Sequence, residues 1–218
     1  MKMKKYFIAI VLTVCSIFGC FSEKFVNFQV QFGEAFCKPR YDSVVDIETE
    51  KSEFGKFALQ LEYLRAKENG FSFGARGAFE YTPFSTKLKY GKEMMCIDMD
   101  GYGWELAPAI GWTIHTKFTT MIQLVSYPVI FSHRYIDNWI AGRTYLQDGT
   151  PVITFRHKKA RICWKTGLGA SIQWGPKGWK HGIVGGINYI IADNYFEKGM
   201  RFDPGFEFSV GYKMSIGL

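Results

Sequence analysis

The side chains that could do hydrolytic chemistry in this chain stand close together at Ser132, His133 and Asp137. A hydroxyl, an imidazole and a carboxylate are the groups of a nucleophilic site, provided that the imidazole can reach the hydroxyl proton. No catalytic motif surrounds these residues, and the other three histidines have no metal-ligand spacing. We therefore expect surface histidines here, no enzymatic activity, and no cofactor or metal.

A second candidate is Asp98-Met99-Asp100-Gly101, which is similar to the start of a calcium-binding loop. Such a loop places oxygen ligands at alternate positions and closes with a glutamate. The later ligands and the closing glutamate are missing at the required spacing. We interpret this segment as a turn.

The elements that must position any such group are strands, and the clearest signal lies at the C-terminus. From Phe206 to Leu218, apolar residues alternate without a break with polar or small ones. A period of two makes a strand with one apolar and one polar face. The same pattern covers residues 26–32, so the first and last strands could pair and close a barrel.

Six further stretches complete the set. Alternation predicts strands over 57–63, 71–81, 104–114, 118–131, 162–174 and 183–191. The pattern is blurred over 118–131. Pro108 interrupts the stretch 104–114, and because proline cannot donate a ladder hydrogen bond, a bulge or kink must accommodate it.

The connections between these strands alternate in length. Short turns lie at 67–70, 115–116 and 175–178, whereas the long connections are 34–55, 82–103, 132–159 and 192–205. Long and short connections therefore fall on opposite ends of the barrel. This asymmetry is typical of outer-membrane barrels, whose short turns are periplasmic and whose long loops are external.

The N-terminus indicates export. A basic segment, an apolar run over 6–18 and small residues up to Ser22 have the layout of a secretory signal peptide, so residues 1–22 are expected to be removed. Lipidation at Cys20 is the alternative, because residues 17–20 are similar to a lipobox. No later apolar run approaches the roughly 20 residues of a membrane helix. The mature chain, 23–218, is thus expected to cross a membrane with strands.

Charge and composition exclude other classes. Aromatic residues make up 17% of the chain and charged residues 22%, which argues against disorder. The net charge is +7, and loss of Lys2, Lys4 and Lys5 with the signal peptide leaves +4. This excess is modest, and no basic stripe interleaved with aromatic residues supports nucleic-acid binding.

The tryptophans fit a membrane-spanning strand. Trp164 and Trp174 are ten residues apart, which at the tilt of a barrel strand is roughly 25 Å of height. Trp104 and Trp112 form a similar, shorter pair. We expect these four residues in the aromatic girdles of the barrel. Core positions in a water-soluble sandwich are the alternative.

Together these features resemble the small outer-membrane barrels, such as the OmpW and OmpA-membrane-domain families, with a small treponemal barrel family as another relative. The resemblance covers nearly the whole mature chain, although the last residue is Leu218 where such families usually end in Phe or Trp. It implies an all-β, eight-stranded antiparallel up-and-down transmembrane barrel in a bacterial outer membrane. It also implies lipid and lipopolysaccharide as surroundings, and assembly machinery that recognises the C-terminal strand.

If the apolar sets face lipid, their alternating partners face inward. These partners form a candidate lumen charge network of Glu62, Arg76, Glu80, Glu105, Arg161, Lys165, Glu207 and Lys213. A first turn that pairs residues 67 and 71 would set Glu62 opposite Arg76. Because eight strands leave an interior that side chains can fill, we expect paired charges to close the barrel.

Two cysteines fall in the long loops of an exported protein. Cys37 and Cys96 could therefore form a disulfide, which would leave Cys163 over. The acidic first loop and the basic third loop, which includes Arg134, could attract each other or remain solvated.

Function would then lie in the loops. The primary expectation is a non-enzymatic surface protein whose external loops contact host or surface molecules. The alternative is a narrow channel for small, hydrophobic solutes, as in OmpW-like barrels. Less favoured are a soluble lipocalin-like barrel and a lipid-modifying enzyme built on His133.

Overall fold

The structure is a computed structural model that describes the backbone of residues 23–36, 39–41, 48–90, 93–116, 119–145, 151–176, 178–193, 200–202 and 204–218. Side chains are described over 23–36, 55–83, 100–116, 119–135, 162–176, 178–191 and 204–218. The signal-peptide prediction and Cys37 fall outside these residues.

Eight long antiparallel strands form the barrel in the described part of the chain. They are β1 (Glu23–Phe36), β3 (Glu48–Ala66), β4 (Gly70–Tyr90), β5 (Glu93–His115), β6 (Thr120–Tyr145), β7 (Pro151–Trp174), β8 (Trp179–Asp193) and β10 (Gly205–Gly217). Two short strands, β2 (Pro39–Tyr41) and β9 (Met200–Phe202), pair with each other. No helix in the described residues is long and apolar enough to cross a membrane.

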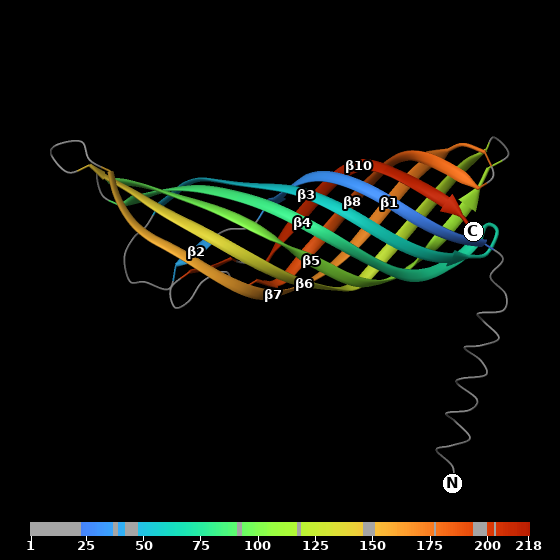
Figure 1. Cartoon of the computed structure of the whole chain (residues 1–218), viewed down its shortest axis with the longest axis horizontal. Helices are drawn as coiled ribbons and strands as arrows, with labels where there is room; N and C mark the ends of the chain where they lie inside the picture. Colours follow the sequence, from blue (N-terminus) through green and yellow to red (C-terminus); the bar gives the residue numbers. More distant parts are fainter. Residues whose placement is uncertain are drawn as a thin grey trace, which may run out of the picture.

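The sheet closes on itself through its first and last strands (Figure 1). β10 pairs with β1 from Phe25–Gly217 to Phe36–Phe206, and with β8 on its other side. This closure satisfies the backbone groups of both edges, as a span through hydrocarbon requires. The prediction of an all-β, eight-stranded antiparallel up-and-down barrel is confirmed.

The stagger of the barrel follows from the pairing register. A line of paired residues that starts at Lys24 on β1 and crosses every strand returns to β1 at Glu34, ten residues further along. For eight strands this stagger gives a tilt of about 43° and a radius of about 8 Å. Side chains can fill an interior of that width.

The first turn has the geometry expected of it. The Lys67 amide donates to the Phe71 carbonyl at 3.1 Å, and Asn69 takes a left-handed φ of 59°. The register that follows sets Glu62 opposite Arg76, so the predicted cross-strand position is confirmed.

An irregularity in β6 explains its blurred sequence pattern. The register of β6 against β7 slips between Tyr127 and Ile130, and both of these side chains are buried while Pro128 and Val129 between them are exposed. The extra residue moves the inward set from odd to even positions. The same extra residue of β6 interrupts the register of β5 against β6 between residues 106 and 110, opposite Pro108, whereas β5 pairs with β4 without a break through Pro108.

The strands run well beyond the predicted limits. β4 and β5 continue as one hairpin to Tyr90 and Glu93, so most of the long loop expected over 82–103 is strand. Asp98-Met99-Asp100-Gly101 lies inside β5, and its interpretation as a turn was wrong. β6 and β7 likewise extend to Tyr145 and Pro151, through the loop expected at 132–159. Backbone pairing continues into segments without apolar alternation. Alternation is the signal from which the strand limits were predicted, so these segments were not recognised as strands.

Burial is inverted relative to a water-soluble barrel. Most large apolar side chains of the strands are exposed, among them Leu168 and Val210 at 60%, whereas Glu62, Gln123 and Lys165 are fully buried. The exposed apolar set forms a continuous belt of the kind that faces lipid. The soluble lipocalin-like alternative, which would bury the apolar set, is therefore wrong.

Candidate functional site: the charged lumen and the outer belt

Lys165 on β7 is the centre of the lumen charge network. Its Nζ lies 2.7 Å from Glu105 Oε1, 2.9 Å from Glu207 Oε2 and 3.1 Å from Glu80 Oε2. These carboxylates come from β5, β10 and β4, and all four side chains are at most 2% exposed. One ammonium group thus connects four strands across the interior.

Two further cations complete this layer. Lys56 Nζ contacts the carboxylates of Glu80 and Glu207. Arg134 Nη2 lies 3.0 Å from Glu80 Oε2 and 3.7 Å from Glu207 Oε2. Asn188 donates a hydrogen bond of 3.1 Å to Glu207 Oε1. Each carboxylate therefore faces several donors, which the desolvated charge requires.

A second group surrounds Glu62 nearer to the short turns. Its carboxylate accepts hydrogen bonds from Asn27 Nδ2 at 2.8 Å, the Tyr127 hydroxyl at 2.6 Å and Lys213 Nζ at 3.0 Å. The donors come from β1, β6 and β10. Glu62 thus connects β3 with strands on both sides of the barrel.

Arg76 links the two groups. It donates to Glu105 Oε2 at 3.0 Å, and its guanidinium carbon lies 4.0 Å from the centre of the Tyr127 ring. The Tyr127 ring supplies a cation–π contact to this buried charge. Arg76 is opposite Glu62 in register, as predicted, but its hydrogen bond goes to the next strand, β5.

The structure places seven of the eight predicted lumen side chains inside the barrel and brings them into one connected network. They are Glu62, Arg76, Glu80, Glu105, Lys165, Glu207 and Lys213. Arg161 lies on β7, and its side chain is outside the described set. Sequence reasoning missed Lys56, although continuing the alternation of β3 by one step past Ala58 would have found it.

Arg134 corrects a loop assignment. The residue was expected in the basic third loop, but it lies on β6 and is 3% exposed inside the lumen. The bulge at 128–129 shifts the inward positions, so a constant period counted from Met121 points the wrong way here. Tyr127 precedes the bulge and shares the inward set of Met121, and it was missed because the blurred pattern of residues 118–131 gave no clear inward set.

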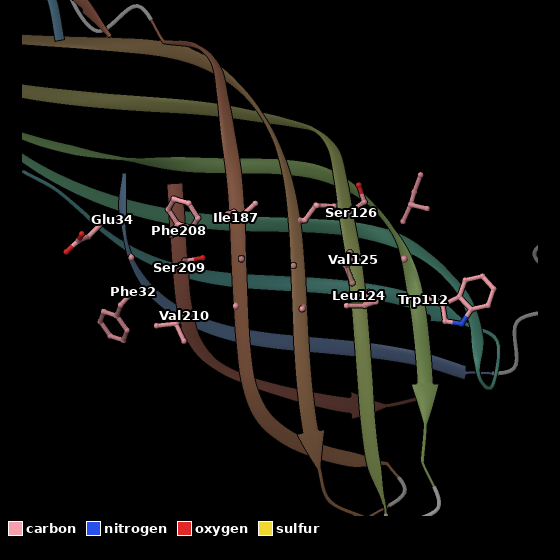
Figure 2. Close-up of a pocket in the computed structure, with 18 of the residues that line it drawn as sticks. Phe32, Glu34, Trp112, Leu124, Val125, Ser126, Ile187, Phe208, Ser209 and Val210 are labelled. Atoms are coloured by element: carbon pink, nitrogen blue, oxygen red, sulfur yellow. The ribbon is translucent and has the colours of Figure 1, made fainter. Parts of the chain in front are cut away.

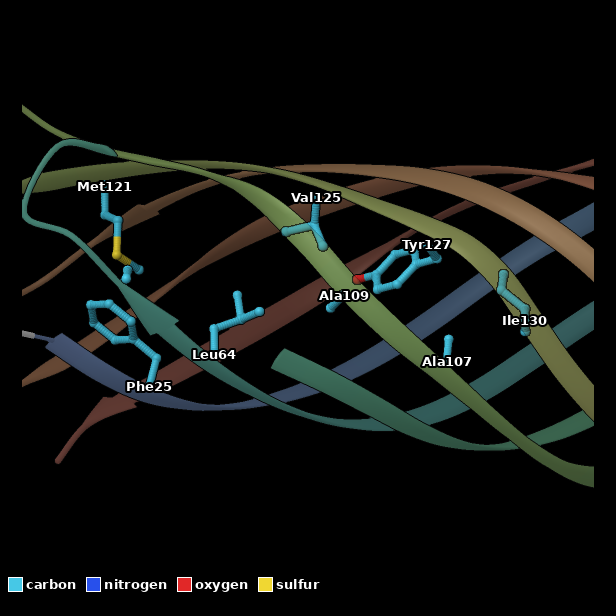
Figure 3. Packing of buried hydrophobic residues seen from close by; sticks show 9 residues of the cluster. Phe25, Leu64, Ala107, Ala109, Met121, Val125, Tyr127 and Ile130 are labelled. Carbon is cyan, nitrogen blue, oxygen red and sulfur yellow. The ribbon is translucent and has the colours of Figure 1, made fainter. Parts of the chain in front are cut away.

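An apolar layer lies near the short-turn end of the interior. Phe25, Leu64 and Met121 come from β1, β3 and β6 and face one another there (Figure 3). Leu64 and Met121 are fully buried, and the Phe25 ring stacks on His115, whose Nε2 lies 2.8 Å from Glu23 Oε2. The lumen therefore contains an apolar layer near the short turns and a layer of ion pairs farther from them.

The predicted girdle tryptophans all lie on the outer surface. Trp104, Trp112, Trp164 and Trp174 are between 43% and 51% exposed. Phe131 lies 5.5 Å from Trp104 and 5.2 Å from Trp164 between ring centres, so aromatic contacts run across β5, β6 and β7. Their role as a membrane-interface girdle remains a prediction.

The candidate hydrolytic group does not assemble. Ser132 is fully buried in the lumen, whereas the neighbouring His133 points outward and stacks on Trp104 at 5.6 Å. Adjacent residues of a strand face opposite sides, so this imidazole cannot take the Ser132 proton. The side chain of Asp137 lies outside the described set. In the described residues, no group of His, Cys, Asp and Glu has the arrangement of a metal site.

The cysteine hypothesis stays a prediction. Cys37 lies outside the described residues, and Cys96 is placed in β5 with its side chain outside the described set. Cys163 is buried inside the barrel, where its Sγ lies 3.9 Å from the Trp164 carbonyl oxygen.

Neither the known protein families nor the curated proteins contain a match to this sequence. Among solved structures, the chain is similar to Neisserial surface protein A, at 9% identity and a TM-score of 0.44, over 88% of this chain and 96% of that one.

Two other solved structures are similar at the same level. Ail, the attachment invasion locus protein of Yersinia pestis, solved with the heparin analogue sucrose octasulfate, has 12% identity and a TM-score of 0.37, over 88% of this chain and 98% of that one. The outer membrane protease OmpT of Escherichia coli has 7% identity and a TM-score of 0.41, over 90% of this chain and 97% of that one. The classification of this chain rests on its own geometry. Its strand number, closure, tilt and inverted burial are those of a small outer-membrane β-barrel.

Proposed function

We propose that this protein is a non-enzymatic surface barrel whose projecting hairpins contact host or surface molecules. The observation that carries the proposal is the length of the strands on one side. β4, β5, β6 and β7 have 21, 23, 26 and 24 residues, whereas β1, β8 and β10 have 14, 15 and 13. A tilted strand needs only about 9–11 residues to cross a membrane.

The excess length lies at the end opposite the short turns. Figure 1 shows β4 to β7 continuing together far past the ends of β1, β8 and β10. At about 3.3 Å per residue and the tilt above, roughly ten extra residues project about 25 Å from the membrane surface. Backbone pairing along both hairpins gives this projection a fixed shape, which suits a contact surface better than separate loops would.

The interior supports a closed barrel over the alternative of a narrow channel. A conduit for hydrophobic solutes needs an apolar, open path, yet the middle of the lumen holds Lys165 bound to three carboxylates. A solute of any kind would have to break those ion pairs and then pass the apolar layer at Phe25, Leu64 and Met121. Both steps are costly.

The proposal includes three kinds of partner. Lipid and lipopolysaccharide surround the apolar belt, the assembly machinery recognises β10, and the surface ligand meets the projection. Nucleic acid is not a partner in this proposal.

The test uses the full chain in fluorescent vesicles that are added to cultured animal cells. A trimmed variant lacks residues 86–97, with an Asn-Gly turn joining Ser85 to Asp98, which are paired in register. We expect the intact protein to attach the vesicles to cells and the trimmed one to attach at least fivefold fewer. Equal attachment by both proteins contradicts a role for this hairpin.

The trimmed protein provides a control for folding, because heat-modifiable gel migration reports the barrel separately from the hairpin. Planar bilayers test the alternative with the same preparation. Reproducible single-channel steps from the intact protein would replace the surface-contact proposal with a channel.

A further inference from the structure

A long hollow crosses the apolar outer belt. It has a volume of about 1200 Å³ and touches β1, β10, β8, β7, β6 and β5 (Figure 2). Its outward-facing walls are exposed apolar side chains, with Phe32, Phe208 and Val210 at one end and Leu124 and Trp112 at the other. Among the described residues that line it, Glu34 alone carries a charge.

The hollow exists because small residues replace large ones at its floor. Ala170 on β7 and Gly185 on β8 are paired across the two strands, and both are at outward positions. Leu168 and Ile187 form the next outward pair, and Ile172 and Ile183 the pair on the other side. A two-residue gap therefore interrupts an otherwise continuous bulky surface.

The path of the hollow follows the pairing register. It runs from Ile110 on β5 through β6, β7, β8 and β10 to Glu34 on β1, along one line of paired residues. Five strand spacings of about 4.8 Å make it about 24 Å long, and the strand tilt makes it climb about 16 Å along the barrel axis. Half of the roughly 30 Å hydrocarbon core is about 15 Å, so the climb equals the depth of one leaflet.

We propose that this hollow, defined as the β5–β1 groove, is a binding site for an acyl chain of a membrane lipid. The groove lies within the belt that faces hydrocarbon, and its apolar lining, length and oblique climb fit one chain that descends from the headgroup level near Glu34. A bound chain would cover the small floor residues that neighbouring side chains leave open.

Other occupants fit less well. A partner strand cannot add to the groove, because β10, β8, β7 and β6 are each paired on both sides along it. A second copy of the chain is distinguished by the test below, because filling the groove would then disrupt a dimer.

The test fills the groove and counts retained lipid. A Cβ added at Gly185 meets no atom nearer than 3.7 Å, so Gly185→Leu fits the backbone and directs its side chain into the groove. The full chain and the double variant Ala170→Leu/Gly185→Leu are reconstituted with dimyristoylphosphatidylcholine and then exchanged into detergent. Native mass spectrometry counts the lipids that remain on each barrel.

We expect one retained lipid on the unmodified protein and at least a fivefold loss in the filled variant. Ala75→Leu is the matched control, because Ala75 is an outward, exposed alanine on β4 and does not line the groove. Ala170→Leu alone replaces the double variant if the latter does not show heat-modifiable migration. Equal retention in filled and control variants overturns the proposal, and so does a dimer that the filling disrupts.

Discussion

Replacing Lys165 by methionine tests the lumen network at its centre. The substitution keeps most of the side-chain volume but removes an ammonium group that lies 2.7, 2.9 and 3.1 Å from Glu105, Glu207 and Glu80. Removing one partner of a buried ion pair costs about 3–5 kcal/mol, because the remaining charge is desolvated and uncompensated. Lys56 and Arg134 keep contact with two of these carboxylates, so we expect a loss in this range rather than a threefold larger one.

The loss is measurable as a shift in thermal unfolding. For a domain of this size, roughly 2–4 °C per kcal/mol converts the loss into a Tm decrease of about 6–20 °C. The assay follows heat-modifiable migration in detergent against temperature. Lys165→Arg is the control and should retain most of the stability, because it keeps the charge. A Lys165→Met protein that unfolds within about 2 °C of the unmodified one would refute the reasoning that this network holds the strands together.

The remaining predictions concern the apolar layer, the belt and the pore. Leu64→Ala should destabilise the barrel by about 2–5 kcal/mol in urea titrations, since it opens a cavity beside Met121, and an unchanged midpoint contradicts close packing there. Leu168→Arg should cost about 2–4 kcal/mol in lipid vesicles, because Leu168 faces hydrocarbon between Trp164 and Trp174; a loss below about 0.5 kcal/mol would place this position in water. The unmodified protein should give no stepwise conductance in planar bilayers.

Much of the barrel could be predicted because its alternation is regular. The strands around Glu62, Arg76, Glu207 and Lys213 keep a strict period of two, so their inward positions follow from counting. The register of the first hairpin followed from its short turn alone. In these strands the period of two determines the face that a side chain occupies, and the short turn determines which residue lies opposite it.

One missed residue, Arg134, lies where the period of two is interrupted. The bulge at Pro128 and Val129 reverses the inward set of β6, which hides Arg134 from a constant period counted from Met121. A bulge is defined by how two strands pair, and the sequence of one strand does not show that pairing. The bonding partner of Arg76 was also unpredictable, because the choice between Glu62 and Glu105 depends on side-chain reach across a closed interior.

The largest difference between the predicted and the observed fold is the length of the β4–β5 and β6–β7 hairpins. Residues 82–103 contain polar and charged positions that read as a loop, yet they pair in register from Thr82–Gly101 to Tyr90–Glu93. Above the membrane neither face of a hairpin must be apolar, so alternation no longer marks the strand. Pairing between neighbours, which the sequence does not display, decides its extent.

The apolar face of every barrel strand should meet lipid. Nitroxide labels at single cysteines from residue 206 to 216, in a background without other cysteines, test it along β10 in vesicles. Oxygen partitions into hydrocarbon, so its collision rate should be high at 206, 208, 210 and 212 and low at 207, 209, 211 and 213, with a period of two. High collision rates at the odd positions, or no alternation, would contradict the account.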